Sequence, residues 1–273
     1  MTPHPSLPSR GIGQSHLPLR RGRHDRGKVI KLDRYTLNRQ IEEQPDAKLK
    51  DLVVQMLYDD IISLKIPPGT RLNVNQLAST LGISRTPVAE AVASLAEMGF
   101  VVNPPDQQGS FVLELSLPDM ISLYQVRDAI ESEAAFLCAY NAEDDTILEL
   151  TRLAAAFRDS VIMHDIRGMK DTDMPFHRMI IDSCGNTYLK RSYDQLVPYL
   201  TRYQASMLEI IGRVSNDNNP WLANVRYNHT AVVSAIRMRL PEMAKQAMSQ
   251  HIAASLNFTS LSGDQSDPFA SLK

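Results

Sequence analysis

Four histidines beyond the N-terminal region are the side chains best suited to hold a metal ion: His164, His177, His229 and His251. Asp173 lies four residues before His177, so both side chains project from one face of a helix and can share an ion. His229 and His251 fall in two later predicted helices, and a bundle that packs these helices side by side can bring Asp173 and the last three histidines together. Spacing alone leaves open that each is a hydrogen-bonded core histidine.

A second group of residues has the pattern of a DNA-binding motif. Apolar residues repeat at intervals of three and four between Asp46 and Leu64, as on one face of a helix. A short helix is predicted over Asn73–Leu81, with Asn73 as its N-cap and Gly82 after its end. A third helix begins at Ser84 and stops near Gly99.

Two short strands follow, Phe100–Val102 and Phe111–Leu113, and a turn-rich loop joins them into a β-hairpin. Three helices and a hairpin in this order are typical of a winged helix-turn-helix, whose second motif helix enters the major groove of DNA. Arg85 can then present its fork to guanine, and Ser84 and Thr86 can donate hydroxyls to bases or phosphates.

The elements that must position the metal-ligating residues are helices. Beyond Ser116 the strand signals disappear, and we predict helices over approximately 118–140, 143–163, 168–184, 187–212, 218–239 and 241–259. The predicted fold is therefore mainly α, with an N-terminal winged helix-turn-helix followed by an all-α helical bundle. The predicted organisation is a disordered basic arm over 1–45, a DNA-binding domain over 46–115, a helical domain over 116–260 for metal, effector and dimerisation, and a frayed tail over 261–273.

Charge is unevenly distributed along the chain, although its net value is only −2. Residues 1–40 carry nine basic and two acidic side chains, whereas residues 47–115 carry five basic and seven acidic ones. A DNA-binding domain with more acidic than basic side chains, such as residues 47–115, attracts DNA phosphates only weakly. Our hypothesis is that the arm supplies the missing attraction, in the minor groove or along the phosphates; the alternative is a dispensable solvated tail.

The cysteine content and the apolar runs of the sequence indicate the cellular compartment of the protein. The two cysteines, Cys138 and Cys184, lie in helical patterns rather than in a disulfide framework, which favours a reducing compartment. The sequence has no apolar run of about 20 residues and no signal-peptide core, so we expect a cytoplasmic protein without membrane contact.

The DNA-binding segment resembles the GntR family of bacterial regulators. The match is carried by Ile66–Leu72 (IPPGTRL), Gln76–Ala78 (QLA) and Leu81–Val88 (LGISRTPV), followed by Glu90-Ala91 and Leu95. The resemblance implies that Arg71 and Arg85 contact DNA and that the wing around Gly109 approaches the minor groove. Ala89 stands where the family usually has a base-reading arginine, so an operator consensus borrowed from relatives should fit this chain badly.

The helical segment resembles the FadR-type ligand domain, known as the FCD domain, that often follows GntR domains. The supporting residues include Tyr124–Arg127 with Glu131, Asp173, Phe176–Arg178, Asn186, His229 and Ala247–Ile252. In the metal-binding branch of that group an Asp and three His hold the ion, which implies Asp173, His177, His229 and His251 here. Such a nitrogen-rich set suits Zn²⁺, our default, or Ni²⁺, and not Mg²⁺ or Ca²⁺.

The resemblance further implies a homodimer and a small organic acid as effector. Arg127 faces the cavity in relatives and can pair with the acid's carboxylate, while an ordinary intrahelical pair with Glu131 is an equal alternative. The predicted function is a ligand-responsive regulator, in the form of a repressor, that binds double-stranded operator DNA and is not an enzyme. The alternatives are a structural metal in a regulator of another ligand, such as an acyl thioester, and a metal-dependent hydrolase, which lacks support because the sequence has no HExxH motif and no evident general base.

Overall fold

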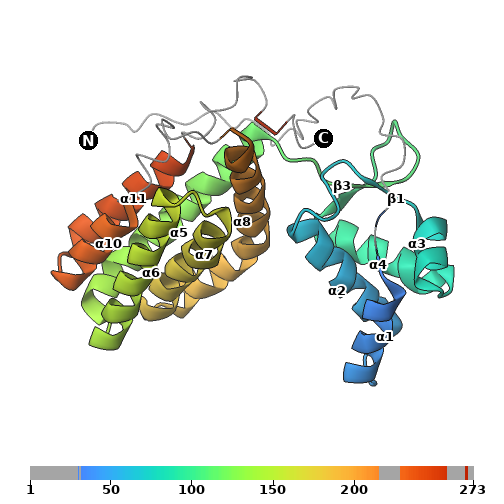
Figure 1. The fold of residues 1–273 in the computed structure, drawn as a ribbon, viewed down its shortest axis with the longest axis horizontal. Helices are drawn as coiled ribbons and strands as arrows, with labels where there is room; N and C mark the ends of the chain where they lie inside the picture. Colours follow the sequence, from blue (N-terminus) through green and yellow to red (C-terminus); the bar gives the residue numbers. More distant parts are fainter. Residues whose placement is uncertain (1–29, 31, 215–227, 257–267, 270–273) are drawn as a thin grey trace, which may run out of the picture.

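The protein has two bodies that lie side by side, a DNA-binding head and a helical bundle (Figure 1). This computed structural model describes residues 30, 32–214, 228–256 and 268–269. The head contains α1 (Arg34–Glu43), α2 (Leu49–Ile62), α3 (Val74–Leu81) and α4 (Arg85–Glu97), with strands β1 (Arg71–Leu72), β2 (Val101–Val102) and β3 (Ser110–Val112). The prediction of a mainly helical chain with a winged helix-turn-helix ahead of a bundle is confirmed.

Local capping defines the helix-turn-helix as the sequence predicted. The Asn73 side chain accepts hydrogen bonds from the backbone N–H groups of Asn75 and Gln76, at 3.0 and 3.2 Å, and so begins α3. Gly82 ends α3 with φ of 67°, a left-handed conformation that glycine adopts without steric cost. Ser84 stands at the N-cap position of α4, although its side chain makes no capping hydrogen bond.

The wing is a three-stranded sheet with the order β1-β3-β2, and the sequence predicted only its hairpin. Both pairings are antiparallel, with Arg71 opposite Phe111 and Val101 opposite Val112. The extra strand is two residues long, too short to give a period-2 signal. This strand places Arg71 next to β3 of the hairpin.

Residues 34–43 differ from the disordered arm predicted over 1–45, because they form α1. The Asp33 carboxylate caps the helix by accepting from the N–H of Tyr35 at 2.9 Å. Leu32 and Leu37 are 5% and 1% exposed and belong to the core of the head. Residues 1–29 and 31 of the predicted arm lie outside the described residues.

The bundle contains α5 (Leu117–Asn141), α6 (Asp144–Ile162), α7 (Ile166–Ser183), α8 (Thr187–Val214), α10 (Asn228–Arg237) and α11 (Pro241–Leu256). The predicted helix over 218–239 is described only from residue 228 onward. Within the predicted frayed tail, Phe269 is 1% exposed and its ring centre lies 5.5 Å from that of Tyr203; most of that tail lies outside the described residues.

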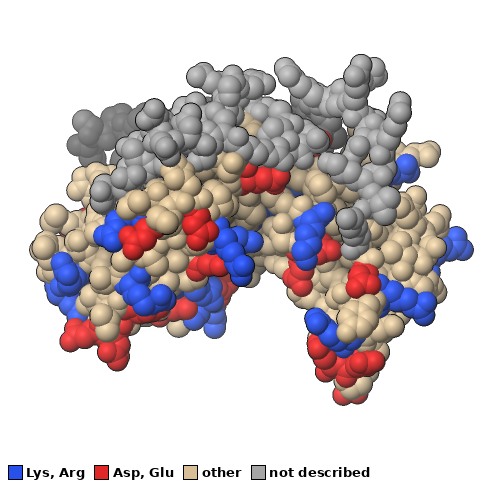
Figure 2. Space-filling view, in the orientation of Figure 1, with Lys and Arg blue, Asp and Glu red and all other residues tan. Residues whose placement is uncertain are grey.

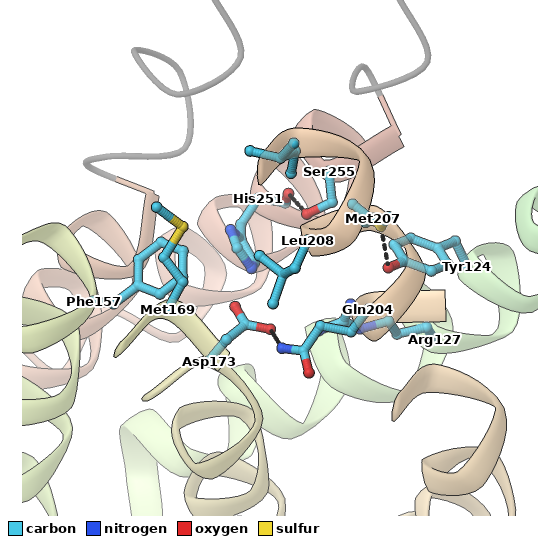
Figure 3. Close-up of a pocket in the computed structure, with 11 residues that line it drawn as sticks. Tyr124, Arg127, Phe157, Met169, Asp173, Gln204, Met207, Leu208, His251 and Ser255 are labelled. Carbon is cyan, nitrogen blue, oxygen red and sulfur yellow. Dashed lines mark hydrogen bonds between the residues drawn. The ribbon is translucent and has the colours of Figure 1, made fainter. Parts of the chain in front are cut away.

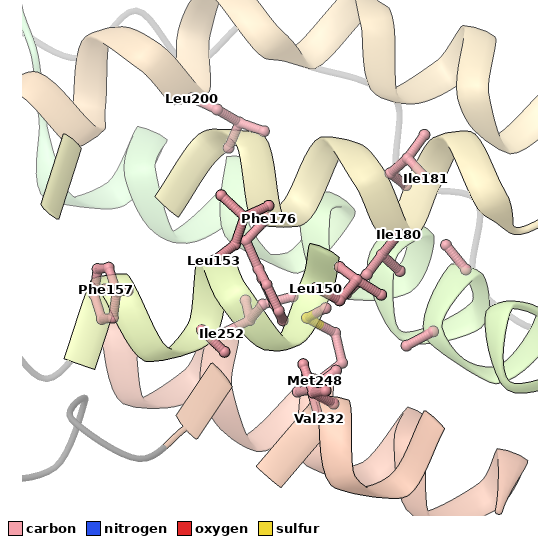
Figure 4. Close-up of a cluster of buried hydrophobic side chains, with 14 of the residues drawn as sticks. Leu150, Leu153, Phe157, Phe176, Ile180, Ile181, Leu200, Val232, Met248 and Ile252 are labelled. Carbon is pink, nitrogen blue, oxygen red and sulfur yellow. The ribbon is translucent and has the colours of Figure 1, made fainter. Parts of the chain in front are cut away.

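One apolar core holds the bundle together and fixes the helices that carry the candidate ligands. Phe176 of α7, Leu150 of α6 and Met248 of α11 are fully buried where these helices meet (Figure 4). Phe176 immediately precedes His177, so its packing fixes the face of α7 that carries Asp173 and His177.

Helix α8 connects the bundle to the head. The Tyr199 ring stacks on Phe100 with ring centres 4.9 Å apart, and its hydroxyl donates to the carbonyl of Met98 at 2.9 Å. Arg202, 2% exposed, donates to the carbonyl of Leu113 just after β3. None of the helices within the described residues has the length and apolar character needed to cross a bilayer.

Candidate metal centre and DNA-binding surface

Asp173, His177, His229 and His251 converge on one point inside the bundle, from three helices. Asp173 and His177 come from α7, His229 from α10 and His251 from α11, and one ligand atom of each lies within 4.8 Å of the others. The histidines are 0–3% exposed, and the Asp173 side chain is 17% exposed. His164, the remaining histidine of the bundle, is outside this group.

Four of the six separations between the candidate ligand atoms are close to those of ligands around one small divalent ion. The Nε2 atom of His177 lies 3.0 Å from that of His251 and 3.4 Å from that of His229. Asp173 Oδ1 lies 3.3 Å from His229 Nε2 and 3.7 Å from His177 Nε2. Zinc–nitrogen bonds of about 2.05 Å in a tetrahedron place neighbouring nitrogens about 3.4 Å apart. These residues therefore fit a zinc-sized ion.

The protonation states of the group are largely those that a metal ion requires. Burial lowers the pKa of His251 well below its usual value, and the neighbouring His229 and His177 lower it further. Burial likewise lowers the pKa of His229. Burial alone would raise the pKa of Asp173, but hydrogen bonds from His177 and His229 lower it well below the usual range. Two neutral imidazoles and one carboxylate are thus ready to coordinate.

His177 is held by a buried carboxylate that the sequence analysis did not assign to the site. Glu131 of α5, 0% exposed, bonds His177 Nδ1 with one oxygen and accepts from Arg127 Nε at 2.6 Å with the other. Burial disfavours the charged form of His177, yet the Glu131 carboxylate raises its pKa overall. Because Glu131 occupies Nδ1, the Nε2 atom is the one directed at the other ligands.

A pocket opens beside this centre and includes Asp173 and His251 in its lining (Figure 3). About 440 Å³ of empty space lies within the pocket and at its mouth, solvent at the opening included. Its walls are mostly apolar and come from α5, α6, α7, α8 and α11. The lining comprises Tyr124, Arg127, Phe157, Met169, Asp173, Gln204, Met207, Leu208, Ile211, His251 and Ser255.

Apart from Nδ1 of the candidate ligand His251, two buried polar atoms in the lining have no hydrogen-bond partner. One is Arg127 Nη2, on a side chain whose Nε is bonded to Glu131, so the predicted intrahelical pair forms and still leaves a free donor. The other is Gln204 Oε1, on a side chain whose Nε2 donates to Asp173 Oδ2 at 2.6 Å. Buried polar atoms of this kind are normally satisfied by protein, water or ligand.

The sequence carries a signal for Gln204, although Gln204 is not among the predicted site residues. Gln204, Met207, Leu208 and Ile211 are spaced i, i+3, i+4 and i+7, so they share one face of α8, and all four line the pocket. Glu131 gave no comparable signal, because its partner His177 lies 46 residues away.

The predicted DNA-contacting residues all lie exposed on the head. Ser84, Arg85 and Thr86 are exposed at the start of α4, in the place where a recognition helix meets base edges. The Arg71 guanidinium lies against Gly109 of the wing, since a Cβ placed on Gly109 would be 2.8 Å from Arg71 Nε. The structure therefore brings Arg71 and Gly109 of the wing together.

Two family models match the chain, and together they cover most of the head and most of the bundle. The model described as "Bacterial regulatory proteins, gntR family" matches residues 49–112, and the model described as "FCD domain" matches residues 122–254.

Named relatives align over most of their own length. The "Probable D-xylose utilization operon transcriptional repressor" of Paenarthrobacter nicotinovorans is 26% identical over 213 residues, covering 78% of this chain and 88% of the relative. The "HTH-type transcriptional repressor RspR" of Escherichia coli (strain K12) is 25% identical, covering 76% and 87%. The "Gluconate operon transcriptional repressor" of Bacillus licheniformis is 23% identical, covering 70% and 76%.

Solved structures share the fold. McbR/YncC of E. coli superposes with a TM-score of 0.59 at 20% identity, covering 79% of this chain and 97% of that one. A putative GntR regulator from Rhodococcus sp. RHA1 gives a TM-score of 0.55 at 19% identity, covering 77% and 97%.

Proposed function

The chain belongs to the GntR family of bacterial regulators and carries an FCD domain after its DNA-binding domain, and from this premise we propose that it is a repressor whose affinity for operator DNA responds to a small carboxylate bound at a divalent metal ion. The family and the relatives are transcriptional regulators, so the chain is not an enzyme, and the hydrolase alternative is wrong. The relatives named above as repressors support the repressing sense.

The observation that carries the proposal is the convergence of four ligand atoms beside a pocket with a buried, unpaired arginine nitrogen. Asp173, His177, His229 and His251 would hold the ion, with Zn²⁺ the first candidate and Ni²⁺ the second. The bound ion would supply a positive anchor for the carboxylate of the effector. Arg127 Nη2 would donate to a second carboxylate oxygen or to a second acidic group.

Gln204 narrows the chemistry of the effector. Its Nε2 is already used by Asp173, so the atom that it offers to the pocket is the acceptor Oε1. An acceptor of this kind is satisfied by a hydroxyl or amine donor. The apolar walls provided by Met169, Leu208 and Ile211 favour a compact ligand with few further polar groups. We therefore expect a small acid that carries a hydroxyl group.

The effector would regulate DNA binding by having different affinities for two arrangements of the protein. A ligand shifts the equilibrium between two states only to the extent that its affinities for them differ. We propose that two copies form a homodimer that binds two half-sites of the operator, in line with the two-fold symmetry common in helix-turn-helix regulators. Arg71, Ser84, Arg85, Thr86 and the wing at Gly109 would make the contacts.

Elemental analysis and thermal shift test this proposal. Wild-type protein should contain close to one divalent ion per chain, and the Asp173→Ala, His177→Ala double variant should lose it while still binding DNA. Small organic acids should raise the melting temperature of the metal-loaded protein, 2-hydroxy acids more than the matching unsubstituted acids, and a chelator should abolish the rise. Unchanged metal content in the double variant, or equal responses with and without chelator, would refute the metal-dependent site.

A further inference from the structure

Helix α1 is built into the head and presents one arginine at the helix-turn-helix. Leu32 and Leu37 are buried in the core of the head, and α1 packs against α2 and α3. The Thr36 hydroxyl donates to the Asp33 carboxylate at 3.3 Å, which adds to the capping of the first turn. The position of Arg34, the first residue of α1, is therefore fixed by packing.

The guanidinium of Arg34 lies over the turn that leads into the recognition helix. A Cβ placed on Gly82 would be 2.7 Å from Arg34 Nη1 and 2.8 Å from Arg34 Cζ, so the glycine leaves the space that the arginine occupies. Gly82 is two residues from Ser84 and three from Arg85, which begin the segment that faces bases. Arg34 is exposed to solvent in this place.

Ion pairing distinguishes Arg34 from the other arginine of its helix. The described part of the head contains four arginines, and only Arg39 has an acidic partner there, Glu43 at 3.5 Å. Arg71 borders the wing and Arg85 begins α4, the two positions already assigned to DNA. Arg34 is the third arginine in the described part of the head that has no ion pair with a described residue, and it lies at the turn before α4.

Charge complementarity indicates what Arg34 binds. The head carries more acidic than basic groups over residues 47–115, and Ala89 leaves the recognition helix without a further cation. In Figure 2, Lys and Arg side chains lie along the margin of the head that faces away from the bundle, while Asp and Glu gather at its lower tip. Exposed arginines beside a recognition helix commonly hold phosphates and fix the register of the protein on DNA.

We propose that Arg34 binds a DNA phosphate beside the major groove entered by α4, so that α1 is part of the DNA-binding surface. The inference rests on the proposed DNA binding and adds a contact outside the segment matched by the GntR model, which begins at residue 49. The contact is independent of base sequence, because phosphates carry no sequence information.

The test measures binding of the full-length protein to a 40-base-pair duplex of arbitrary sequence across a range of KCl concentrations. Arg34→Gln should reduce the slope of log affinity against log salt by about 0.9 for each bound protomer, which corresponds to roughly a five- to tenfold weaker affinity at 0.1 M salt. Arg34→Lys should keep the wild-type slope. The matched control is Arg39→Gln, on the same helix and also exposed, which should keep the wild-type slope as well.

Each outcome bears on the proposal. The proposal is overturned if Arg34→Gln and Arg39→Gln have the same salt slope. If both slopes equal that of the wild type, Arg34 makes no phosphate contact; if both are reduced equally, the effect is that of net charge and not of a specific contact. If the wild-type protein fails to bind the duplex at any salt concentration, the proposed DNA binding fails as well. Thermal melting of each variant shows whether the helix remains folded, and because Arg34 is exposed we expect an unchanged melting temperature.

Discussion

At the scale of single residues, the buried contacts from Arg127 to Glu131 and from Glu131 to His177 show how α5, a helix without any candidate metal ligand, positions a residue of the candidate metal centre. Glu131 is fully buried, and a buried carboxylate is tolerated only when it is paired and hydrogen-bonded. Burial raises its pKa, but the Arg127 guanidinium and His177 outweigh that effect and lower the pKa overall. Its negative charge therefore persists and holds the His177 ring in one orientation.

Replacing Glu131 by glutamine should weaken metal binding without removing a ligand. The amide keeps the size of the side chain but loses the charge that orients His177, and carboxylates in this position typically contribute 10–100-fold to metal affinity. We expect a loss of that order for zinc in a competition titration. The control is Glu133→Gln, two residues along α5, because Glu133 pairs with Lys245 at the surface, at 2.7 Å.

The comparison of these two variants separates orientation of the ligand from a general effect of charge on α5. Equal zinc affinities in Glu131→Gln and Glu133→Gln would contradict the role assigned to Glu131. A change in the coordination spectrum of a cobalt-substituted sample, seen only in Glu131→Gln, would support it independently of affinity, since the spectrum reports ligand geometry.

At the scale of elements, α1 shows how tertiary packing creates a helix where local sequence does not predict one. Its ten residues contain only two aliphatic side chains, Leu37 and Ile41, and Ile41 is 39% exposed. Isolated helices of this length are marginal in water. Burial of Leu37 against α2 and α3, together with the Asp33 cap, stabilises the helix.

Truncating Leu37 should therefore destabilise the head. Leu37→Ala removes a side chain that is 1% exposed, and such truncations cost about 2–5 kcal/mol in a well-packed core. The measurement is urea denaturation, with hydrogen exchange reporting on α1 itself. Tyr35→Ala on the same helix is the control, because Tyr35 is 74% exposed and its truncation should change the free energy of unfolding by less than about 0.5 kcal/mol.

If Leu37→Ala leaves both the unfolding free energy and the exchange protection of α1 unchanged, then α1 is not docked as described. In that case the fixed position of Arg34 would also lose its basis.

Elements with strong local signals were predictable from sequence, and those created by distant contacts were not. Asn73 and Gly82 bounded α3 correctly because capping and left-handed turns depend on single residues. The i, i+4 pair Asp173 and His177 was likewise visible, since both lie on α7. The convergence with His229 and His251 depends on how three helices pack, which spacing permits but does not determine, and the resemblance to the FadR-type domain supplied that step. The strand β1, helix α1 and the role of Glu131 all depend on partners far along the chain.

At the scale of the whole molecule, α8 links the candidate effector pocket to the DNA-binding head. Gln204 contacts Asp173 and lines the pocket, while Arg202, two residues earlier, donates to the carbonyl of Leu113 at the end of the wing. Burial lowers the pKa of Arg202 to about 10, so the guanidinium stays protonated at neutral pH and keeps its donors. A ligand that moves Gln204 thus acts on a helix whose other contacts reach the head.

The distribution of charge over the molecule requires that groups outside residues 47–115 provide most of the attraction to DNA. Residues 47–115 are net acidic, yet they must approach a polyanion, and the first 29 residues carry six basic side chains against one acidic one. Each cation that neutralises a phosphate steepens the dependence of affinity on salt by about 0.9. The N-terminal segment therefore has the capacity to dominate that dependence, whereas Arg34 accounts for one contact.

Deleting residues 1–29, with α1 and its cap left intact, should flatten the salt dependence by several units, clearly more than Arg34→Gln. The preference for operator over arbitrary DNA should fall less than the affinity itself, because phosphate contacts raise affinity on every sequence. Fluorescence anisotropy with a labelled duplex measures both quantities. A full-length chain whose six basic residues in this segment are changed to glutamine separates charge from length, and it should behave like the deletion. A slope unchanged in both proteins would contradict a contribution of this segment to phosphate binding and would leave Arg34 and Arg71 as the candidate phosphate contacts of the head.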